Sequence, residues 1–373
     1  MDKWAQKYGG FKDPTAKMFI DGKDIPFDGS KKGIKVLGIQ VEKSVGCEAS
    51  TCIVKVKWER KQDDPYTPPF MSVFKMGAKL KIDIGYNKKT STVFVGYISS
   101  IEIDSEADND TVVLVKGMDV KVLMMSNRRT EFIKGANTYP KAAQNVLNDY
   151  ASKADGVKVK VQGAPEVKFP IGPINESDYG FLCRMAALSG ALFFVDNGNV
   201  KFVSMYSEKN AKDTIEKSVI SRIRMSVDLW GIPKQVEAIF QDPKHYKQTG
   251  KGAASKPDDV GKGSVASSVG KIINSKVVLV DNTASSAKEA DFIAQAEQNR
   301  RNSDFVIITV YLSNGIPDLK LGTAYKIDGV GDMFDNSFIV YSIKYEIDGY
   351  GNSSSSLILK SSVLEKPKSA GVM

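Results

Sequence analysis

The chain is poor in the side chains on which most catalytic and metal sites depend. It contains one histidine, His245, and three cysteines among its 373 residues. These residues cannot build a two-histidine metal site or a zinc site with two cysteine pairs. His245 also lies in a Lys-, Gly- and Ser-rich stretch that offers no rigid support for a catalytic base. The sequence therefore predicts no enzyme, and no catalytic, cofactor-binding or metal-binding residue.

The cysteines are Cys47, Cys52 and Cys183. An odd number in a long chain argues against a disulfide scaffold and for synthesis in a reducing compartment. Cys47 and Cys52 are interpreted as two thiols near the start of a strand. Cys183 could act as a nucleophile with His245, but its apolar neighbours would raise the thiol pKa, so a buried structural cysteine is favoured.

Long apolar runs are also missing. The first residues, MDKWAQKYGGFKDP, contain no apolar core of a signal peptide. No window approaches the roughly 18 uncharged apolar residues that a membrane-spanning helix needs. We therefore expect synthesis and folding in the cytoplasm, with no membrane insertion by the chain itself.

Positive charge exceeds negative charge, with 52 Lys and Arg against 44 Asp and Glu. Much of the surplus lies in the Lys/Gly/Ser-rich segment 244–271, which predicts a solvated loop. The alternative is a surface for nucleic acid or an acidic partner, with Lys251, Lys256 and Lys262 as contacts. Only Tyr246 could stack on a base there, so no specific nucleic-acid binding is expected.

The hydrophobic pattern predicts an α+β fold that is mostly β. Period-two runs with turn residues between them indicate antiparallel β-barrels, and helical spacing with possible caps at Thr138, Ser177 and Gly190 indicates helices between the two β regions. The predicted parts are an N-terminal arm (1–14), a first β-barrel (15–130), an α+β domain (131–217), a second β-barrel (218–362) with the loop at 244–271 and a helix at 282–302, and a disordered tail (363–373).

Several sequence blocks, in order along the chain, resemble the phage late control D (baseplate hub) family, which includes the hub half of the type VI secretion spike protein. They are 77–86, 93–98 and 114–119 in the first barrel, 175–186 and 190–198 in the middle domain, and 287–301, 315–322, 330–331 and 338–340 in the second. Tyr345 occupies a position where the family often has histidine, and we interpret this as a packing variation.

The resemblance implies two tube-protein-like barrels in each chain and a homotrimer, whose six barrels match a sixfold tail tube above and a threefold spike below. The expected protein is a structural baseplate hub of a contractile phage tail or tail-like injection particle, enclosing a central channel. Its expected partners are the tube protein, a spike on a separate polypeptide, other baseplate proteins and the tape measure protein. The alternatives are a tail-associated enzyme that degrades cell wall, or a basic module that binds nucleic acid or a partner.

Overall fold

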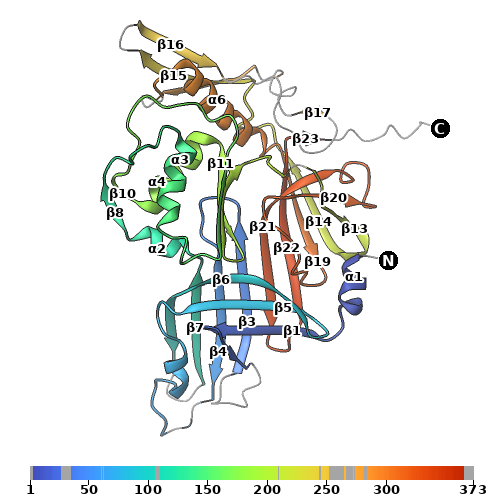
Figure 1. Cartoon of the computed structure of the whole chain (residues 1–373). Coiled ribbons are helices and arrows are strands. Elements are labelled where there is room, and N and C mark those ends of the chain that lie inside the picture. The colour runs from blue at the N-terminus through green and yellow to red at the C-terminus, as the bar shows by residue number, and fades with distance from the viewer. Residues whose placement is uncertain are drawn as a thin grey trace, which may run out of the picture.

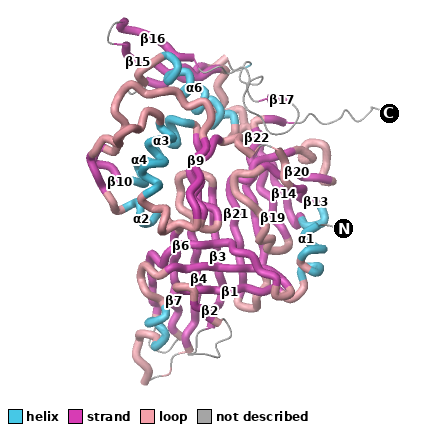
Figure 2. The backbone as a smooth tube through the Cα atoms, viewed as in Figure 1, coloured by secondary structure: helices cyan, strands magenta, loops and turns pink. Residues whose placement is uncertain are grey.

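The computed structural model describes residues 3–26, 35–59, 61, 63–105, 110–208, 210–242, 245–251, 264–265, 272, 274–280 and 284–364. Its main element is a 13-stranded, largely antiparallel sheet that takes strands from both ends of the chain (Figure 1). In Figure 2 the helices between residues 121 and 302 and the two three-stranded sheets lie above the part of this sheet built from residues 14–118. The predicted fold class, α+β and mostly β, is confirmed.

The first β-rich region folds into two crossing layers. Its strands are β1 (Pro14–Ile20), β2 (Lys23–Ile25), β3 (Lys35–Ser44), β4 (Thr51–Trp58), β5 (Lys79–Tyr86), β6 (Lys89–Asp104) and β7 (Thr111–Met118), with a short 3₁₀ helix η2 (Pro69–Val73). Figure 1 shows β1 and β5 crossing in front of β3, β4 and β7. Alternate apolar residues such as Val54, Ile82 and Val115 are buried in the core.

The second β-rich region continues the same sheet. It contains β13 (Asp213–Glu216), β14 (Ile220–Val227), β19 (Val306–Leu312), β20 (Ala324–Asp328), β21 (Ser337–Asp348) and β22 (Ser353–Ser361), with a 3₁₀ turn η3 (Lys217–Val219). β21 pairs with β3 in antiparallel register from Ser342 opposite Ser44 to Asp348 opposite Gly38. The sequence did not predict that hydrogen bonding continues from one β region into the other, which gives both a single hydrophobic core.

The middle unit has its own core, and its helix ends are set by local sequence. It comprises α2 (Lys121–Met125), β8 (Arg128–Thr130), α3 (Tyr139–Asn148), β9 (Gly156–Lys160), β10 (Ile174–Ser177), α4 (Asp178–Ser189), β11 (Ala191–Asp196) and β12 (Asn199–Ser204). Thr138 and Ser177 cap α3 and α4 by accepting backbone N–H bonds. Gly190 ends α4 in the left-handed conformation. These three predicted caps are confirmed.

A long helix, α6 (Ala287–Asn302), packs against a small sheet formed by β15 (Gln235–Asp242), β16 (His245–Lys251) and β18 (Lys276–Val280). The helix was predicted from residue 282, but it begins at 287 because the Ser286 hydroxyl accepts the Glu289 N–H. A Cβ on Gly190 would lie 2.8 Å from the Ala296 Cβ, so α4 and α6 meet at their smallest residues. The alanine-rich spacing of α6 predicted this close approach.

Two predicted irregular segments contain regular structure. The prediction that 244–271 is a loop is wrong at its start, because β16 pairs with β15 from Glu237 opposite Lys251 to Asp242 opposite His245. Later in the segment, β17 (Ser264–Val265) pairs with β23 (Val363–Leu364), so the predicted disordered tail begins with a short strand. Backbone pairing overrides the Gly- and Lys-rich composition of these segments. Residues 365–373 lie outside the described residues.

The N-terminal arm packs on both β regions: its helix contacts the second, and the Tyr8 and Phe11 rings lie 5.7 and 5.2 Å from the Tyr86 ring of the first. Its elements are α1 (Lys3–Lys7) and a 3₁₀ turn η1 (Gly9–Phe11), and Figure 1 shows α1 beside β13 and β14. The buried Trp4 ring lies 6.4 Å from the Tyr325 ring, measured between centroids. Lys3 forms an ion pair with Asp213, with 3.0 Å between the charged atoms.

Candidate assembly surface

One face of the long sheet is shared by both β regions. Because side chains alternate along a strand, residues that pair directly across neighbouring strands lie on the same face. One such row crosses the sheet without interruption and contains no buried residue: Arg222, Tyr311, Ser356, Lys344, Glu42, Thr51 and Met118. In the adjacent row Val310, Leu357 and Ile343 are buried. The sheet therefore has one core face and one accessible face.

The accessible face carries charges of both signs, with more basic than acidic groups. The Arg222 guanidinium lies over the Tyr311 ring at 5.4 Å from its centroid. Lys344 pairs with Glu346 on its own strand at 2.7 Å. Other charged residues on this face are Arg224, Lys360, Lys55, Lys116, Glu42 and Glu102. Partly exposed charges of both signs are more typical of a hydrated surface or a polar protein contact than of a hydrophobic interface.

The accessible face ends at an open edge. Within the described residues, β14 pairs with β19 and with no second strand, so its other side presents unpaired backbone groups. Val227 at its end is 39% exposed, and Tyr311 on the neighbouring β19 is 38% exposed. An eight-residue edge strand with exposed apolar side chains beside it is a site where another chain can add a strand.

A buried ion pair joins the sheet to the middle unit on the core side. The Lys43 ammonium on β3 donates to Asp196 at 3.1 Å and to the Asn197 side-chain oxygen at 2.9 Å. Burial alone would raise the pKa of Asp196, but the Lys43 and Lys201 ammonium groups outweigh it and lower the pKa. The Lys43 ammonium also faces the Tyr345 ring at 5.6 Å from the centroid. Tyr345 is fully buried and donates its hydroxyl to the Ile316 carbonyl at 3.1 Å.

A second buried ammonium, that of Lys121, holds the same two parts together. Its Nζ donates to the carbonyls of Gly46, Cys47 and Glu48 in the turn after β3, at 3.2, 3.2 and 2.8 Å. It also donates to the Phe193 carbonyl on β11 at 3.0 Å. Burial lowers the pKa of Lys121, while the nearby Asp119 carboxylate opposes that shift. The four carbonyls replace the water that this charge has lost.

Of the lysines predicted as contact residues, the structure describes only the backbone of one. The backbone of Lys251 lies at the end of β16, where it pairs with Glu237, and its side chain is outside what the structure describes. Lys256 and Lys262 lie outside the described residues. The contact role of all three therefore stays a prediction.

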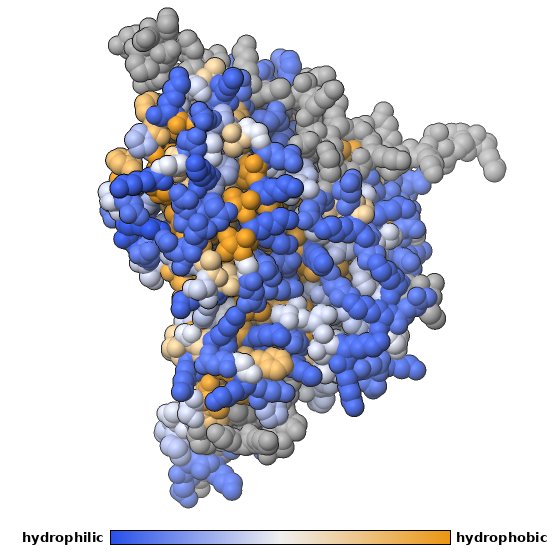
Figure 3. Space-filling view, viewed as in Figure 1, coloured by the Kyte–Doolittle hydropathy of each residue, from blue (hydrophilic) through white to orange (hydrophobic). Residues whose placement is uncertain are grey.

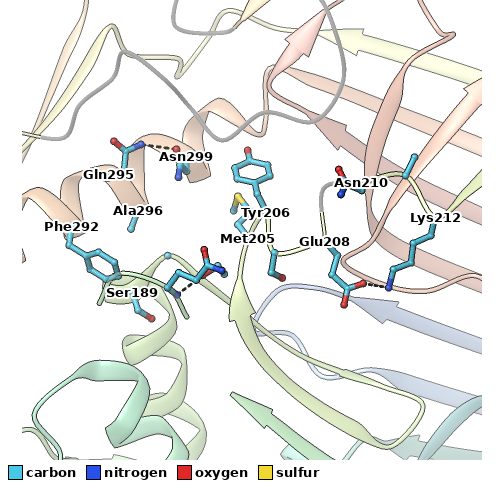
Figure 4. A pocket seen from close by; sticks show the side chains of 15 residues that line it. Ser189, Met205, Tyr206, Glu208, Asn210, Lys212, Phe292, Gln295, Ala296 and Asn299 are labelled. Carbon is cyan, nitrogen blue, oxygen red and sulfur yellow. Dashed lines mark hydrogen bonds and ion pairs between the residues drawn. The ribbon is translucent and has the colours of Figure 1, made fainter. Parts of the chain in front are cut away.

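One cavity is lined by mainly polar side chains from separate segments of the chain. This cavity, of about 700 Å³, lies between the end of α4, the segment after β12 and α6 (Figure 4). Its described lining contains neither histidine nor cysteine, and its charged groups are Glu208 and Lys212, which pair with each other. Figure 4 shows Gln295 and Asn299 along one side, joined by a 2.8 Å hydrogen bond. The lining thus offers polar contacts but no acid–base pair poised for proton transfer.

The remaining features of interest in the described residues are metal clusters, membrane spans and surface polarity. Among the described residues there is no group of three His, Cys, Asp or Glu side chains that could hold a metal ion. None of the helices in the described ranges is long and apolar enough to cross a membrane. In Figure 3 the visible surface is mainly hydrophilic, with apolar side chains gathered near its centre.

Cys47 and Cys52 lie near the start of strand β4, as predicted, whereas Cys183 differs from its prediction. Cys52 is fully buried, and burial raises the pKa of its thiol. Cys183 was predicted to be buried, but it is only partly so. On α4 the side chains of Phe181, Leu182 and Met185 enter the core, and the 100° step per residue leaves Cys183 on the flank of the helix. There it lies beside Cys47, a proximity that their distance in the sequence gave no sign of.

Solved structures with similar folds are phage tail and secretion proteins. A tail protein from Neisseria meningitidis has a TM-score of 0.63 at 15% identity, covering 93% of this chain and 96% of that one. The 43 kDa tail protein of prophage MuSo2 from Shewanella oneidensis gives 0.65 at 13% identity, covering 93% and 98%. The E. coli c3393 protein, a type VI secretion component, gives 0.54 at 12% identity, covering 94% and 79%. At these identities the likeness shows a shared fold.

Sequence comparisons give a more specific result. No curated protein sequence matches the chain. One family model matches residues 13–349, which include both β regions and the middle unit, and it describes the Alg8 N-terminal domain rather than the late control D family of the predicted resemblance. The chain therefore belongs to the Alg8 N-terminal domain family.

Proposed function

We propose that the protein is a structural subunit of the hub in a phage tail or tail-like injection particle, related to the late control D proteins. In this proposal three chains form a ring that encloses a central channel and adapts the sixfold tube to a threefold spike. The observation that carries it is the fold, which matches phage tail proteins over more than nine-tenths of both chains. A fold shared over the whole length supports a shared structural role more strongly than a shared domain would.

The geometry of the sheet supports a ring. Its accessible face runs across both β regions without a break, and it ends at the unpaired edge of β14. In the proposed trimer, this face lines the channel and the β14 edge meets a neighbouring copy. A closed ring covers every such edge, so no open strand remains to recruit further chains. Mixed charge along the wall keeps the channel hydrated.

The proposed partners follow from this position in the particle. They are two further copies of the chain, the tail tube protein, a spike protein on a separate polypeptide, other baseplate proteins and the tape measure protein. The chain would be made in the bacterial cytoplasm and assembled into the baseplate. We propose no catalytic step for it, because Glu208 and Lys212, the charged groups in the described lining of the 700 Å³ cavity, are paired with each other. Lysis of cell wall in a zymogram by this chain alone would contradict that statement.

The trimer is tested by the mass of the purified protein in solution. Light scattering after size exclusion should give a trimer, either for the chain alone or after addition of its tube or spike protein. Val227→Lys places a charge at the exposed end of β14 and should reduce the trimer fraction. Val278→Lys is the matched control, because this valine is 45% exposed on β18, in a different sheet. A monomer in every mixture would contradict the proposed trimer. An equal loss of the trimer fraction in both variants would contradict the proposed role of the β14 edge.

A separate proposal concerns the role of the lysine-rich segment 244–271. We propose that Lys251, Lys256 and Lys262 contact a neighbouring tail protein and do not bind DNA. The test is a titration of duplex DNA into the protein and into a variant with glutamine at these three positions. We expect no salt-dependent binding that is lost in the variant. Such binding would favour the nucleic-acid alternative, because release of counterions makes phosphate contacts strongly dependent on salt.

A further inference from the structure

Two of the three cysteines meet, although they come from different parts of the chain. Cys47 lies in the turn between β3 and β4 of the first β region, and Cys183 lies on α4 of the middle unit. The two thiols lie close enough to shift each other's pKa, and the Tyr179 hydroxyl on α4 reaches the Cys47 carbonyl at 2.8 Å. Both side chains are partly exposed, whereas Cys52 is fully buried. A small reagent in solution can therefore reach the pair but not the third thiol.

Hydrogen bonds from two other residues hold the pair in place. The Tyr179 hydroxyl donates to the Cys47 carbonyl at 2.8 Å. Tyr179 lies four residues before Cys183 on α4, so the two side chains share one face of the helix. The Lys121 ammonium donates to the same carbonyl at 3.2 Å. The Cys47 backbone is thus fixed from both sides, next to the turn of helix that carries Cys183.

The environment also favours ionisation of one thiol. The hydrogen bond from Cys183 lowers the pKa of Cys47, and the nearby Lys121 ammonium acts in the same direction against the effect of burial. The same hydrogen bond and burial raise the pKa of Cys183. Cys47 is therefore the thiol that reacts first, since thiolate and not thiol is the nucleophile.

We propose that Cys47 and Cys183 are a redox-sensitive pair that forms a disulfide when the protein meets an oxidising solution. The oxidant is a low-molecular-weight disulfide of the glutathione class. The Cys47 thiolate attacks one of its sulfurs, forms a mixed disulfide and releases one glutathione thiolate. Cys183 then loses its proton and attacks the Cys47 sulfur, which releases the second glutathione thiolate. Two protein thiols are oxidised and one glutathione disulfide is reduced to two thiols.

The bond would tie the first β region covalently to the middle unit. It would close a loop that contains β4 to β7, α2, α3 and the start of α4, and closing so long a loop restricts the unfolded chain more than the folded one. The oxidised protein is therefore more resistant to heat than the reduced one. This inference concerns the thiols of the chain itself and does not depend on the proposed function.

The test uses the full chain incubated with oxidised glutathione and compared with a reduced sample. After oxidation, intact mass should show the loss of two hydrogens, and maleimide should label one cysteine only after denaturation. Digestion should release a peptide in which Cys47 and Cys183 are joined, and the melting temperature should rise. Cys47→Ser and Cys183→Ser should each abolish the mass loss and the thermal shift. Cys52→Ser is the matched control and should retain both.

Three outcomes would overturn the proposal. The first is labelling of both Cys47 and Cys183 by maleimide after oxidation. The second is a mass loss that persists in Cys47→Ser, which would mean that Cys52 takes part. The third is a dimer on a non-reducing gel that disappears in Cys47→Ser, because this result would place the bond between two copies of the chain. A trimer measured under reducing conditions tests the proposed function separately.

Discussion

The two joints of the molecule are made in different ways. The joint between the two β regions is the β3–β21 ladder, where backbone hydrogen bonds and a shared apolar core spread the stabilisation over many residues. The joint between the sheet and the middle unit contains two buried ammonium groups, Lys43 and Lys121, with their oxygen partners. A distributed joint tolerates loss of one contact, whereas a joint centred on buried charge depends on single side chains.

The largest effect is expected at the charged joint. Lys121→Met removes the ammonium that satisfies four carbonyls and leaves the Asp119 carboxylate buried, which should cost about 3–5 kcal/mol of unfolding free energy. Guanidinium unfolding measures this loss, and calorimetry should show the middle unit melting separately. Lys121→Met combined with Asp119→Asn should recover part of it, and the exposed Lys55→Met is the control. A loss below about 1 kcal/mol would mean that the joint does not depend on this charge.

The ion pair of Lys43 and Asp196 should give a smaller effect that depends on pH. Asp196→Asn weakens a charge-assisted hydrogen bond and should cost about 2 kcal/mol at neutral pH. Because its neighbours lower the pKa of Asp196 in the folded protein, its stabilisation is fully present above the unfolded value of about 4 and is lost as the pH falls through the folded value. Denaturation curves of the two proteins should therefore converge in acid, and a constant difference would contradict this assignment.

The distributed joint should respond more weakly to loss of one polar contact. Tyr86→Phe removes the β5 hydroxyl that shares a 2.8 Å hydrogen bond with the Ser353 hydroxyl on β22 but keeps the buried ring, so we expect a cost of about 1 kcal/mol. Calorimetry should still show the two β regions melting together. If the two β regions melt separately in this variant, the joint between them depends on single side chains, as the charged joint does. The contrast between the two joints would then be wrong.

The smallest effect is expected on the accessible face of the sheet, next to the β3–β21 ladder. Lys344 and Glu346 form an ion pair on β21, with side chains that are 36% and 57% exposed. Water and salt screen such a pair, so Lys344→Gln should change the unfolding free energy by less than about 0.5 kcal/mol. Guanidinium unfolding at low and high salt measures the change. A larger cost that persists in high salt would show that this face contributes to folding as well as to assembly.

Local features were the part of the molecule that the sequence could predict. The caps at Thr138 and Ser177 and the glycine at 190 depend on a few neighbouring residues, so their patterns specify the helix ends. Long-range pairing was not predictable. The alternation of β3 shows that one face is buried but carries no information on its partner, which is β21, about 300 residues later.

The candidate site was harder to predict for the same reason. Lys43 and Lys121 look like surface lysines in the sequence, and only the fold brings carbonyls and Asp196 around their charges. Cys47 and Cys183 lacked a local spacing that would connect them. Conversely, the composition of 245–251 indicated a loop, yet pairing with β15 makes it a strand. In each case a tertiary contact decides a role that local sequence leaves undetermined.

The pairing of β3 with β21, together with the packing of α1 near Tyr325, has a consequence for biosynthesis. During synthesis, β3 and Trp4 meet these partners only after about 300 further residues have been made. Until then β3 presents an uncovered edge, and Trp4 lacks the aromatic ring against which it packs. Nascent chains that stop before β21 are thus exposed to aggregation, because this part of the fold cannot close until β21 has been made.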